Sequence, residues 1–327
     1  MLCQMADDGR RPKANGEIPV FLCEGGSMPE IIFSQRPRPR WRVWVFSDLQ
    51  QSEPSRAERC MRIAVDDFQR LNLPCDQLWY LGDAVEGENP ELVRQMVQIQ
   101  LELLRPLGVP LRYVNGNHDF DLFQFDPNLP LQTPFWAAVS AQPGWRTTAR
   151  LDEFYFWEEL GGVHVLFMSD HCDVHANPPR WTSTHGALQR GPEQYPHSAA
   201  VWADLKAQIA AKTGPVIIAG HGAFPGGNRA GALMQRLLPL PENVKLVLYG
   251  HAHIGDLRLV KENVYRKIAY VDHQRIPQVD VASLEDARGD EIRSAIVEYH
   301  TDGSLLVLFR DHKCARWPEV LAIGASR

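Results

Sequence analysis

The sequence lacks the features that would place it in a membrane or outside the cell. No stretch approaches the ~20 consecutive apolar residues that a membrane-spanning helix needs, since polar residues interrupt even the apolar-rich segment 92–109. No apolar segment before a small-residue cleavage site stands near the N-terminus, as a secretory signal would require. The cysteines are widely spaced without a CxxC pair, and we interpret them as free thiols in a reducing compartment. We therefore expect a soluble cytoplasmic protein without a membrane partner.

Positive charge is also scarce. The formal net charge is −6 and the isoelectric point is near 6.1, so the chain as a whole has no electrostatic reason to bind a nucleic-acid backbone. No basic stripe is interleaved with aromatic residues, and we therefore expect no nucleic-acid partner. The GxSxG elbow is missing as well, which sets aside an α/β hydrolase with a serine nucleophile.

The composition that remains is that of a globular protein, with 44% hydrophobic and 23% charged residues. Residues 1–40 mix proline, glycine, arginine and acids without periodicity, and we predict a flexible N-terminal extension. We predict one domain over 41–315 and a C-terminal tail over 316–327. Within the domain, the polar, histidine-rich stretch near 171–200 is interpreted as an insertion.

From Trp41 onward, short β-prone runs alternate with helical patterns. One helix is expected to begin at Ser55, whose hydroxyl would form a capping box with Glu58. Asn89 is a good cap for the next helix, with Pro90 in its first turn. This alternation predicts an α/β sheet with helices packed on its faces. The β-prone runs are 43–46, 78–81, 111–114, 164–168, 215–219 and 246–249, followed by a β-hairpin of 294–299 and 305–309.

Polar residues with metal-binding side chains follow five of these runs. Ligands of α/β sheets bind beyond the carboxyl ends of the strands, so we expect these residues to lie close together. Oxygen and imidazole donors suit Mn²⁺, Fe or Zn²⁺, and the absence of cysteine argues against a thiolate zinc cluster. Taken singly, each residue is better explained as a helix cap, a turn residue or a half-buried histidine. The residues are Asp48, Gln50, Asp83, Asn117, His118, Asp119, His221, His251 and His253.

In their order along the chain, the motifs Asp-Leu-Gln, Gly-Asp, Gly-Asn-His-Asp, Gly-His and Gly-His-Ala-His resemble those of the calcineurin-like metallophosphoesterases. The pattern of that family runs DxH, GD, GNH(D/E), a separate H and then GHxH, and the resemblance covers roughly 41–256. The resemblance implies a metallophosphoesterase-type β-sandwich of mixed sheets flanked by helices, in four α/β/β/α layers.

The resemblance also implies two divalent metal ions as cofactors, with Mn²⁺ favoured over Fe or Zn²⁺. Asp83 would bridge the two metals. One metal would be held by Asp48, Gln50, Asp83 and His253, and the other by Asp83, Asn117, His221 and His251.

Gln50 departs from the family pattern, which has histidine at this position. A neutral amide oxygen is a weaker donor than imidazole, so this site leans toward Mn²⁺ or binds its metal more loosely. The same glutamine occurs in members that resemble manganese-dependent ADP-ribose/CDP-alcohol diphosphatases. From that resemblance we carry over the chemistry and not the substrate.

By the same resemblance, His118 would lie outside the metal ligands and either stabilise the phosphoryl transition state or protonate the leaving alkoxide, with Asp119 as its orienting partner. The mechanism implied is in-line attack of a metal-bound hydroxide on phosphorus. The expected partner is a small nucleotide-like or phosphorylated metabolite carrying a phosphodiester, phosphoanhydride or phosphomonoester. A polynucleotide nuclease is the alternative within this chemistry. A non-catalytic scaffold of the same fold is disfavoured, because the scaffold member that resembles this fold lacks the catalytic histidine.

Other residues carry weaker hypotheses. Asp170 follows the run 164–168 and either lies near the metals or only ends that strand. The aromatic segment 154–157 could stack a nucleobase, but a packed hairpin is favoured. Four polar residues could bind the substrate phosphate or a base, although exposed loop positions are favoured for each of them: His171, His175, Arg180 and His185.

Overall fold

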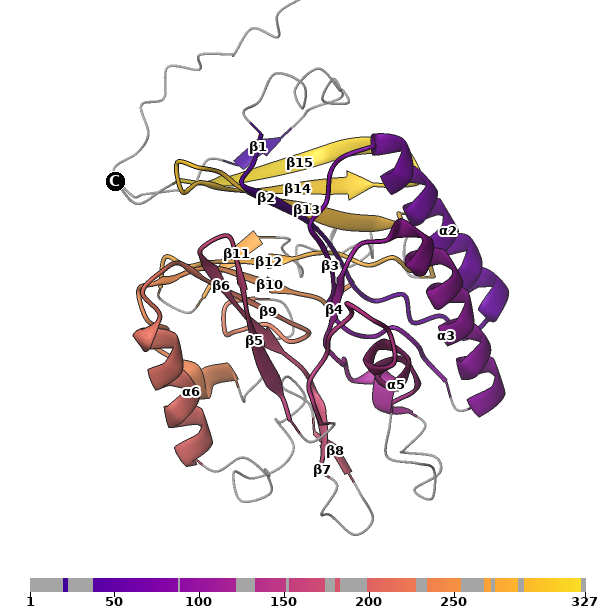
Figure 1. The fold of residues 1–327 in the computed structure, drawn as a ribbon, viewed down its shortest axis with the longest axis horizontal. Coiled ribbons are helices and arrows are strands. Elements are labelled where there is room, and N and C mark those ends of the chain that lie inside the picture. The colour runs from indigo at the N-terminus through magenta and orange to yellow at the C-terminus, as the bar shows by residue number, and fades with distance from the viewer. Residues whose placement is uncertain are drawn as a thin grey trace, which may run out of the picture.

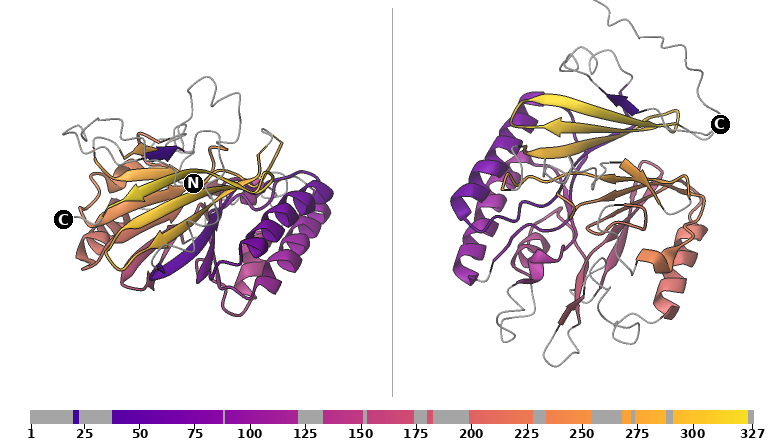
Figure 2. Two further views of the ribbon diagram at one scale, coloured as in Figure 1. Left: turned by 90° about the horizontal axis from the view of Figure 1, so that it is seen from above. Right: turned by 180° about the vertical axis from the view of Figure 1, so that it is seen from behind.

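Two β-sheets lie face to face between helices, as the computed structural model shows (Figure 1). On one side α2 and α3 pack on the outer face of the seven-stranded sheet, and on the other α6 packs on the six-stranded sheet. Figure 2 shows the same order of layers from behind. The predicted four-layer α/β/β/α fold is therefore confirmed. The structure describes residues 20–22, 38–87, 89–121, 133–150, 153–173, 180–182, 199–227, 234–253, 268–271, 274–287 and 291–324.

The seven-stranded sheet is mixed. Strands β2, β3 and β4 run parallel, whereas the remaining neighbours pair antiparallel, including the predicted hairpin of β13 and β14. In spatial order the strands are β1 (Val20–Leu22), β15 (Arg316–Ile323), β14 (Leu305–Asp311), β13 (Arg293–Tyr299), β2 (Trp41–Phe46), β3 (Gln77–Tyr80) and β4 (Leu111–Tyr113).

The predicted C-terminal tail over 316–327 is wrong as far as Ile323, because β15 pairs along β14. The register shifts where Asp311 faces Arg316 and Phe309 faces Glu319, so β15 carries one extra residue there. A bulge of this kind leaves room for Pro318, which has no N–H to give to the ladder. The predicted extension 1–40 is also part of this sheet at β1, and most of its remainder lies outside the described residues.

The six-stranded sheet is mixed as well. Its central strands β12, β10, β9 and β6 run parallel, and both edge strands pair antiparallel. In spatial order they are β11 (Ile268–Tyr270), β12 (Pro277–Asp280), β10 (Val244–Tyr249), β9 (Val216–Gly220), β6 (Val163–Met168) and β5 (Tyr155–Leu160). The predicted insertion near 171–200 contains the two-stranded ribbon of β7 (His171–Asp173) and β8 (Arg180–Thr182) and the start of α6 (Ala199–Ala211), and the rest of it lies outside the described residues.

Alternation along β2 explains how one strand joins two layers of the core. Trp41, Val43 and Val45 contact the layer between the two sheets, whereas Trp44 and Phe46 pack beneath α2 and α3. Successive side chains of a strand point to opposite faces, so an all-apolar strand is expected only where both faces are covered. The layered packing therefore follows directly from this run of six apolar or buried residues.

The two long helices of the seven-stranded side each begin at a proline. α2 (Pro54–Leu71) starts one residue before the predicted Ser55, with Glu53 at the N-cap and without a side-chain cap hydrogen bond, because the residue before proline is held extended and proline suits the first turn. The Asn89 cap of α3 (Pro90–Leu104) is confirmed, since its side chain accepts from two backbone N–H groups. In the described part of the chain, the remaining helices are α5 (Pro134–Ser140) and the 3₁₀ turns η1 (Arg105–Leu107), η2 (His118–Phe120) and η5 (Met234–Leu237). Across the described residues, no helix combines the length and apolar character needed to span a membrane.

A buried hydrogen-bonded network ties α2 to the seven-stranded sheet. Asp67 accepts from Arg310 Nε at 2.7 Å and Nη2 at 2.8 Å and from His312 Nδ1 at 2.9 Å. Ser294 Oγ lies 2.6 Å from His312 Nε2 and accepts from Trp44 Nε1. The order serine, histidine, aspartate is that of a catalytic triad, but Ser294 is fully buried. We therefore assign this network to stability.

Replacing Asp67 with asparagine is expected to cost about 3–5 kcal/mol of unfolding free energy, because it leaves the buried Arg310 charge uncompensated. Urea unfolding at neutral pH measures this cost. Asp66→Asn on the exposed face of the same helix is the matched control, with an expected change within about 0.5 kcal/mol. Equal stability of the two variants would contradict the assignment.

The same network predicts a pH dependence. Although burial opposes ionisation, the hydrogen bonds from Arg310 and His312 lower the pKa of Asp67 to about 2 from 3.8. Because the pKa of Asp67 is lower in the folded than in the unfolded state, the ionised carboxylate contributes about 2 kcal/mol to the free energy of unfolding above pH ~4. This contribution is lost as the pH falls toward ~2. The Asp67→Asn variant should lack this part of the acid destabilisation.

Candidate metal centre

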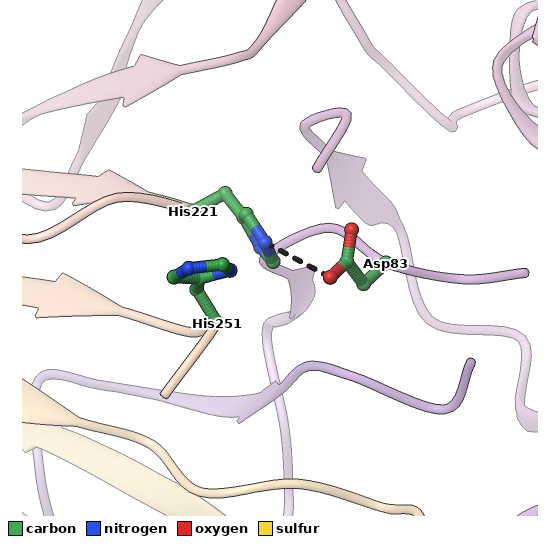
Figure 3. Close-up of side chains that lie close together, drawn as sticks. All are labelled: Asp83, His221 and His251. Atoms are coloured by element: carbon green, nitrogen blue, oxygen red, sulfur yellow. Dashed lines mark ion pairs between the residues drawn. The ribbon is translucent and has the colours of Figure 1, made fainter. Parts of the chain in front are cut away.

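Loops that follow strands of both sheets meet at one edge of the sandwich. Asp83 follows β3 of the seven-stranded sheet, whereas His221 and His251 follow β9 and β10 of the six-stranded sheet. Figure 3 shows these three side chains converging, with the ion pair between Asp83 and His221 marked. The structure thus brings together residues that the sequence separates by up to 168 positions.

Among the residues that the structure describes, two groups of side chains have the geometry to hold a cation. One consists of Asp83, His221 and His251, and the other of Asp48, Asp83 and His253. Within each group the potential ligand atoms all lie within 4.8 Å of one another, and every member is buried. Asp83 belongs to both groups, so its carboxylate stands between two candidate positions.

The loops hold these residues in an uncommon backbone conformation. Asp48, Asp83, His251 and His253 have φ of 55°, 52°, 70° and 48°, in the left-handed region that costs a non-glycine residue of order 1–3 kcal/mol. Hydrogen bonds from the backbone hold two of them there, since Asp48 N–H donates to Gly82 O at 3.1 Å and His251 N–H donates to the Asp48 carboxylate at 2.9 Å. Such strain clusters at functional sites.

Two glycines of the motifs are required by close approach. A Cβ on Gly116 would lie 2.2 Å from Asp83 Oδ1, and a Cβ on Gly250 would lie 2.0 Å from Ser47 Oγ. Both distances are well inside van der Waals contact. The GNHD loop can therefore pack against the GD loop, and the GHAH loop against the chain at Ser47 and Asp48, only because these positions lack side chains.

His221 presents a defined ring nitrogen to the centre. Its Nδ1 lies 2.7 Å from the carbonyl oxygen of Leu81, and a carbonyl only accepts, so Nδ1 carries the proton. Its Nε2 faces Asp83 Oδ2 at 3.1 Å and Asn117 Oδ1 at 3.1 Å. Although burial opposes the charged form, the charge of Asp83 raises the pKa of His221 to about 10. A positive charge is therefore favoured between this nitrogen and these oxygens.

His253 is oriented in the same manner. Its Nε2 faces Asp48 Oδ1 at 3.3 Å, and its Nδ1 lies 3.0 Å from Oε1 of the buried Glu285. A metal-binding histidine usually donates its other ring N–H to a carboxylate or carbonyl, which fixes the tautomer. Both His221 and His253 satisfy this condition.

The donor set fits a divalent cation. It consists of carboxylate oxygens and imidazole nitrogens, the ligand types of Mn²⁺, Fe and Zn²⁺. Although burial opposes ionisation of Asp83, the charge of His221 holds the pKa of Asp83 far below its usual range. At Asp48, burial raises the pKa. Two buried carboxylates this close to each other need positive charge nearby, which a bound cation would supply.

His118 lies beside this centre with a different partner from the one expected. Its Nδ1 pairs with Asp121 Oδ2 at 2.8 Å, because residues three apart in the 3₁₀ turn η2 lie on the same side. Although burial opposes protonation, the hydrogen bond to Asp121 and the charge of Asp83 raise the pKa of His118 to about 9. About a quarter of the side chain, 27%, is exposed, so the ring can reach a bound molecule.

The prediction that Asp119 orients His118 is wrong. The buried Asp119 carboxylate instead accepts from the backbone N–H groups of Asp83 at 3.0 Å, Ala84 at 2.9 Å and Gly116 at 2.7 Å. Burial and the charge of Asp83 raise the pKa of Asp119 to about 7. Asp119 therefore ties the GD loop to the GNHD loop.

Gln50 and Asn117 also lie at the centre. Gln50 is buried, and its backbone N–H donates to Asp83 O at 3.1 Å. Asn117 Oδ1 faces His221 Nε2 at 3.1 Å. Every residue proposed from sequence as a ligand is thus at this edge of the sandwich.

The weaker hypotheses have mixed outcomes. Asp170 is buried, donates its backbone N–H to Asn115 O at 2.9 Å and adds to the negative charge that raises the pKa of His221, so it is near the centre as well as at a strand end. The aromatic segment 154–157 enters the packed hairpin of β5 and β6, as favoured. The structure does not test the hypotheses for the four polar residues of the 171–200 stretch. His175 and His185 lie outside the described residues, and the side chains of His171 and Arg180 are not described.

Two residues at the centre were missed from sequence. Asp121 could have been found, because a turn after Asn117 places residues 118 and 121 on the same side. Glu285 left no comparable signal, since 32 residues separate it from His253 and it lies in a loop without periodicity.

Comparison with known proteins agrees with this geometry. A model of the calcineurin-like phosphoesterase family matches residues 42–255. A purple acid phosphatase, PPD1, from seeds of yellow lupin (Lupinus luteus) has a similar fold, with a TM-score of 0.50, 13% identity, and coverage of 88% of this chain and 55% of the lupin chain. The hypothetical protein PH1004 of Pyrococcus horikoshii is matched with a TM-score of 0.36, 10% identity, and coverage of 87% and 89%, a likeness too weak to support an argument. No curated protein matches the chain.

The lupin enzyme shows the fold alone, and this chain spans just over half of its length. The family model carries the assignment, because its match covers more than half of this chain. All seven candidate ligands, from Asp48 to His253, lie within the matched segment. The chain therefore belongs to the calcineurin-like phosphoesterase family.

Proposed function

We propose that this metal-dependent phosphoesterase uses two metal ions, with Mn²⁺ favoured, to hydrolyse a small nucleotide-like or phosphorylated metabolite in the cytoplasm. The observation that carries the dinuclear proposal is the membership of Asp83 in both ligand groups. A carboxylate can donate from two oxygens and offset the repulsion between two cations. Asp83 Oδ2 faces His221, while Asp83 Oδ1 accepts from the backbone N–H of His118 at 2.8 Å.

Two divalent cations, when bound, would withdraw charge from the phosphoryl oxygens and lower the pKa of water toward ~7. The residues that would hold them divide into two sets that share Asp83. The first set is Asp48, Gln50, Asp83 and His253, and the second is Asp83, Asn117, His221 and His251.

His118 is placed to deliver a proton to the leaving oxygen. Its Nδ1 is bound to Asp121, which leaves Nε2 for a substrate atom. Although burial opposes protonation, the hydrogen bond to the Asp121 carboxylate favours the protonated ring, as a general acid requires. The same residue disfavours the scaffold alternative, because a binding protein has no need of a proton donor beside its metal ligands.

The substrate class rests on less direct observations. The negative net charge of −6 disfavours a polynucleotide. Gln50 favours the branch that resembles ADP-ribose and CDP-alcohol diphosphatases, and it suits Mn²⁺ because an amide oxygen is a hard donor. ADP-ribose and a CDP-alcohol are therefore the first natural substrates to test.

Hydrolysis of bis-p-nitrophenyl phosphate and p-nitrophenyl phosphate by metal-stripped protein resupplied with Mn²⁺ tests the proposal. We expect turnover that requires added metal, and the ratio of diester to monoester rates then assigns the substrate class. The Asp83→Ala variant, purified in parallel, controls for a contaminating phosphatase. Absence of turnover from protein that has bound its metal would support the scaffold alternative.

A further inference from the structure

The loop 281–287 supplies a contact to the metal centre from outside the segment that matches the family. We propose that Glu285 in this loop is a positioning residue, which fixes the ring of His253 and thereby sets the affinity of one of the two metal positions. This inference rests on the proposed dinuclear centre. It concerns only the position formed by Asp48, Asp83 and His253.

The hydrogen bonds of His253 define the role of Glu285. Glu285 Oε1 lies 3.0 Å from Nδ1 of the ring, and Asp48 Oδ1 lies 3.3 Å from Nε2. A neutral imidazole has one N–H and one lone pair. When the Nδ1–H group donates a hydrogen bond to Glu285, Nε2 carries the lone pair, which points to the metal position. A carboxylate in this place also makes the imidazole a stronger ligand.

Glu285 is itself held rigidly. Its second oxygen, Oε2, accepts from the backbone N–H of Ala287 at 2.7 Å, and its own N–H donates to Asp48 O at 3.1 Å. Leu284 N–H donates to Ser47 O at 3.0 Å. The loop therefore runs alongside the chain at Ser47 and Asp48, and Glu285 is only 3% exposed.

A second anchor holds the loop from the side of α2. Asp286 pairs with Arg56 Nε at 3.0 Å and with Arg59 Nη2 at 2.7 Å. These pairs fix the residue next to Glu285, while Glu285 itself faces the opposite way, toward His253. The loop thus contacts the ring of His253 through the buried carboxylate of Glu285.

Titration of metal-stripped protein with Mn²⁺ by isothermal calorimetry tests the inference without relying on activity. We expect the Glu285→Ala variant to lose about 10–100-fold in affinity at one of the two positions, and to retain the wild-type affinity at the other, where His221 and His251 bind. Glu285→Gln keeps an oxygen that can accept from Nδ1 and loses the charge, so its loss should be smaller.

Glu298→Gln is the matched control. Glu298 is equally buried and also pairs with a histidine, His300, at 3.3 Å, but neither residue belongs to the metal-binding groups. We expect it to change stability and leave both Mn²⁺ affinities unchanged. A nitrogen-15 spectrum of the diamagnetic Zn²⁺-loaded protein gives a second readout, in which the Nδ1–H signal of His253 should be present in the wild type and shifted or lost in Glu285→Ala.

Three outcomes would overturn the inference. Wild-type affinity at both positions in Glu285→Ala would show that the contact does not matter for binding. Equal weakening at both positions would show a general structural role for the loop. Binding of fewer than two Mn²⁺ ions by the wild-type protein would contradict the dinuclear centre itself. This result is distinguished from the other two because it is measured on the wild type, before any variant is compared.

Discussion

Replacing Asp83 with alanine is expected to abolish the binding of two metal ions and to lower kcat/KM by at least about 10³-fold. Asp83 is the one residue of both ligand groups in the described part of the chain, and its removal takes a ligand from each position. Metal ions supply several kcal/mol of transition-state stabilisation, and each 1.36 kcal/mol is a factor of ten in rate. The loss of about 4 kcal/mol gives the expected factor.

Asp48→Ala is the informative comparison for this variant. Asp48 belongs to only one group, with His253, so its removal should weaken that position more than the one formed with His221, which it touches through the hydrogen bond from His251 N–H. Metal content after gel filtration and hydrolysis of bis-p-nitrophenyl phosphate measure both effects. Equal metal content in the Asp83 and Asp48 variants would contradict the bridging role of Asp83.

Replacing His118 with alanine is expected to lower kcat by about 10²–10⁴-fold for substrates with a poor leaving group, the range typical of general acid catalysis. His118 contacts Asp121 through Nδ1, and its ring is partly exposed. The loss should be much smaller for p-nitrophenyl esters, because p-nitrophenolate leaves without needing a proton. Metal binding should be unchanged, since His118 belongs to neither ligand group.

Asp121→Asn separates orientation from charge at this histidine. An asparagine oxygen can still accept from Nδ1, but without the carboxylate charge that helps to raise the pKa of His118. The variant should therefore show a smaller loss than His118→Ala with the same dependence on the leaving group. A His118→Ala loss that is equal for alkyl and p-nitrophenyl esters would contradict the role as proton donor and favour stabilisation of the phosphoryl group.

The candidate ligands could be predicted from sequence because each follows a β-prone run directly. Asp48 follows β2 and Asp83 follows β3 by a few residues, and parallel strands bring their carboxyl ends to one edge. No long-range contact has to be known for this inference. The two faces of β2 were likewise readable, because an all-apolar run such as 43–46 is expected to be covered on both sides.

The residues that were missed depend on contacts between segments distant in the chain or on the exact shape of a turn. Asp119 stands next to His118, yet the 3₁₀ turn directs its carboxylate to the backbone of the GD loop and brings Asp121 to the ring. Glu285 reaches His253 through a contact between two loops, and the two residues are 32 positions apart in the sequence. β15 was mistaken for a tail. Its Pro318 has no N–H for the ladder, and the register shift against β14 shows how the strand accommodates it.

The most direct test of the account is the anomalous scattering of crystals of the metal-stripped protein grown with Mn²⁺. We predict two peaks that flank the carboxylate of Asp83, one beside His253 and the other beside His221 and His251. A single peak, or peaks that do not contact Asp83, would contradict the dinuclear centre on which the proposed function depends.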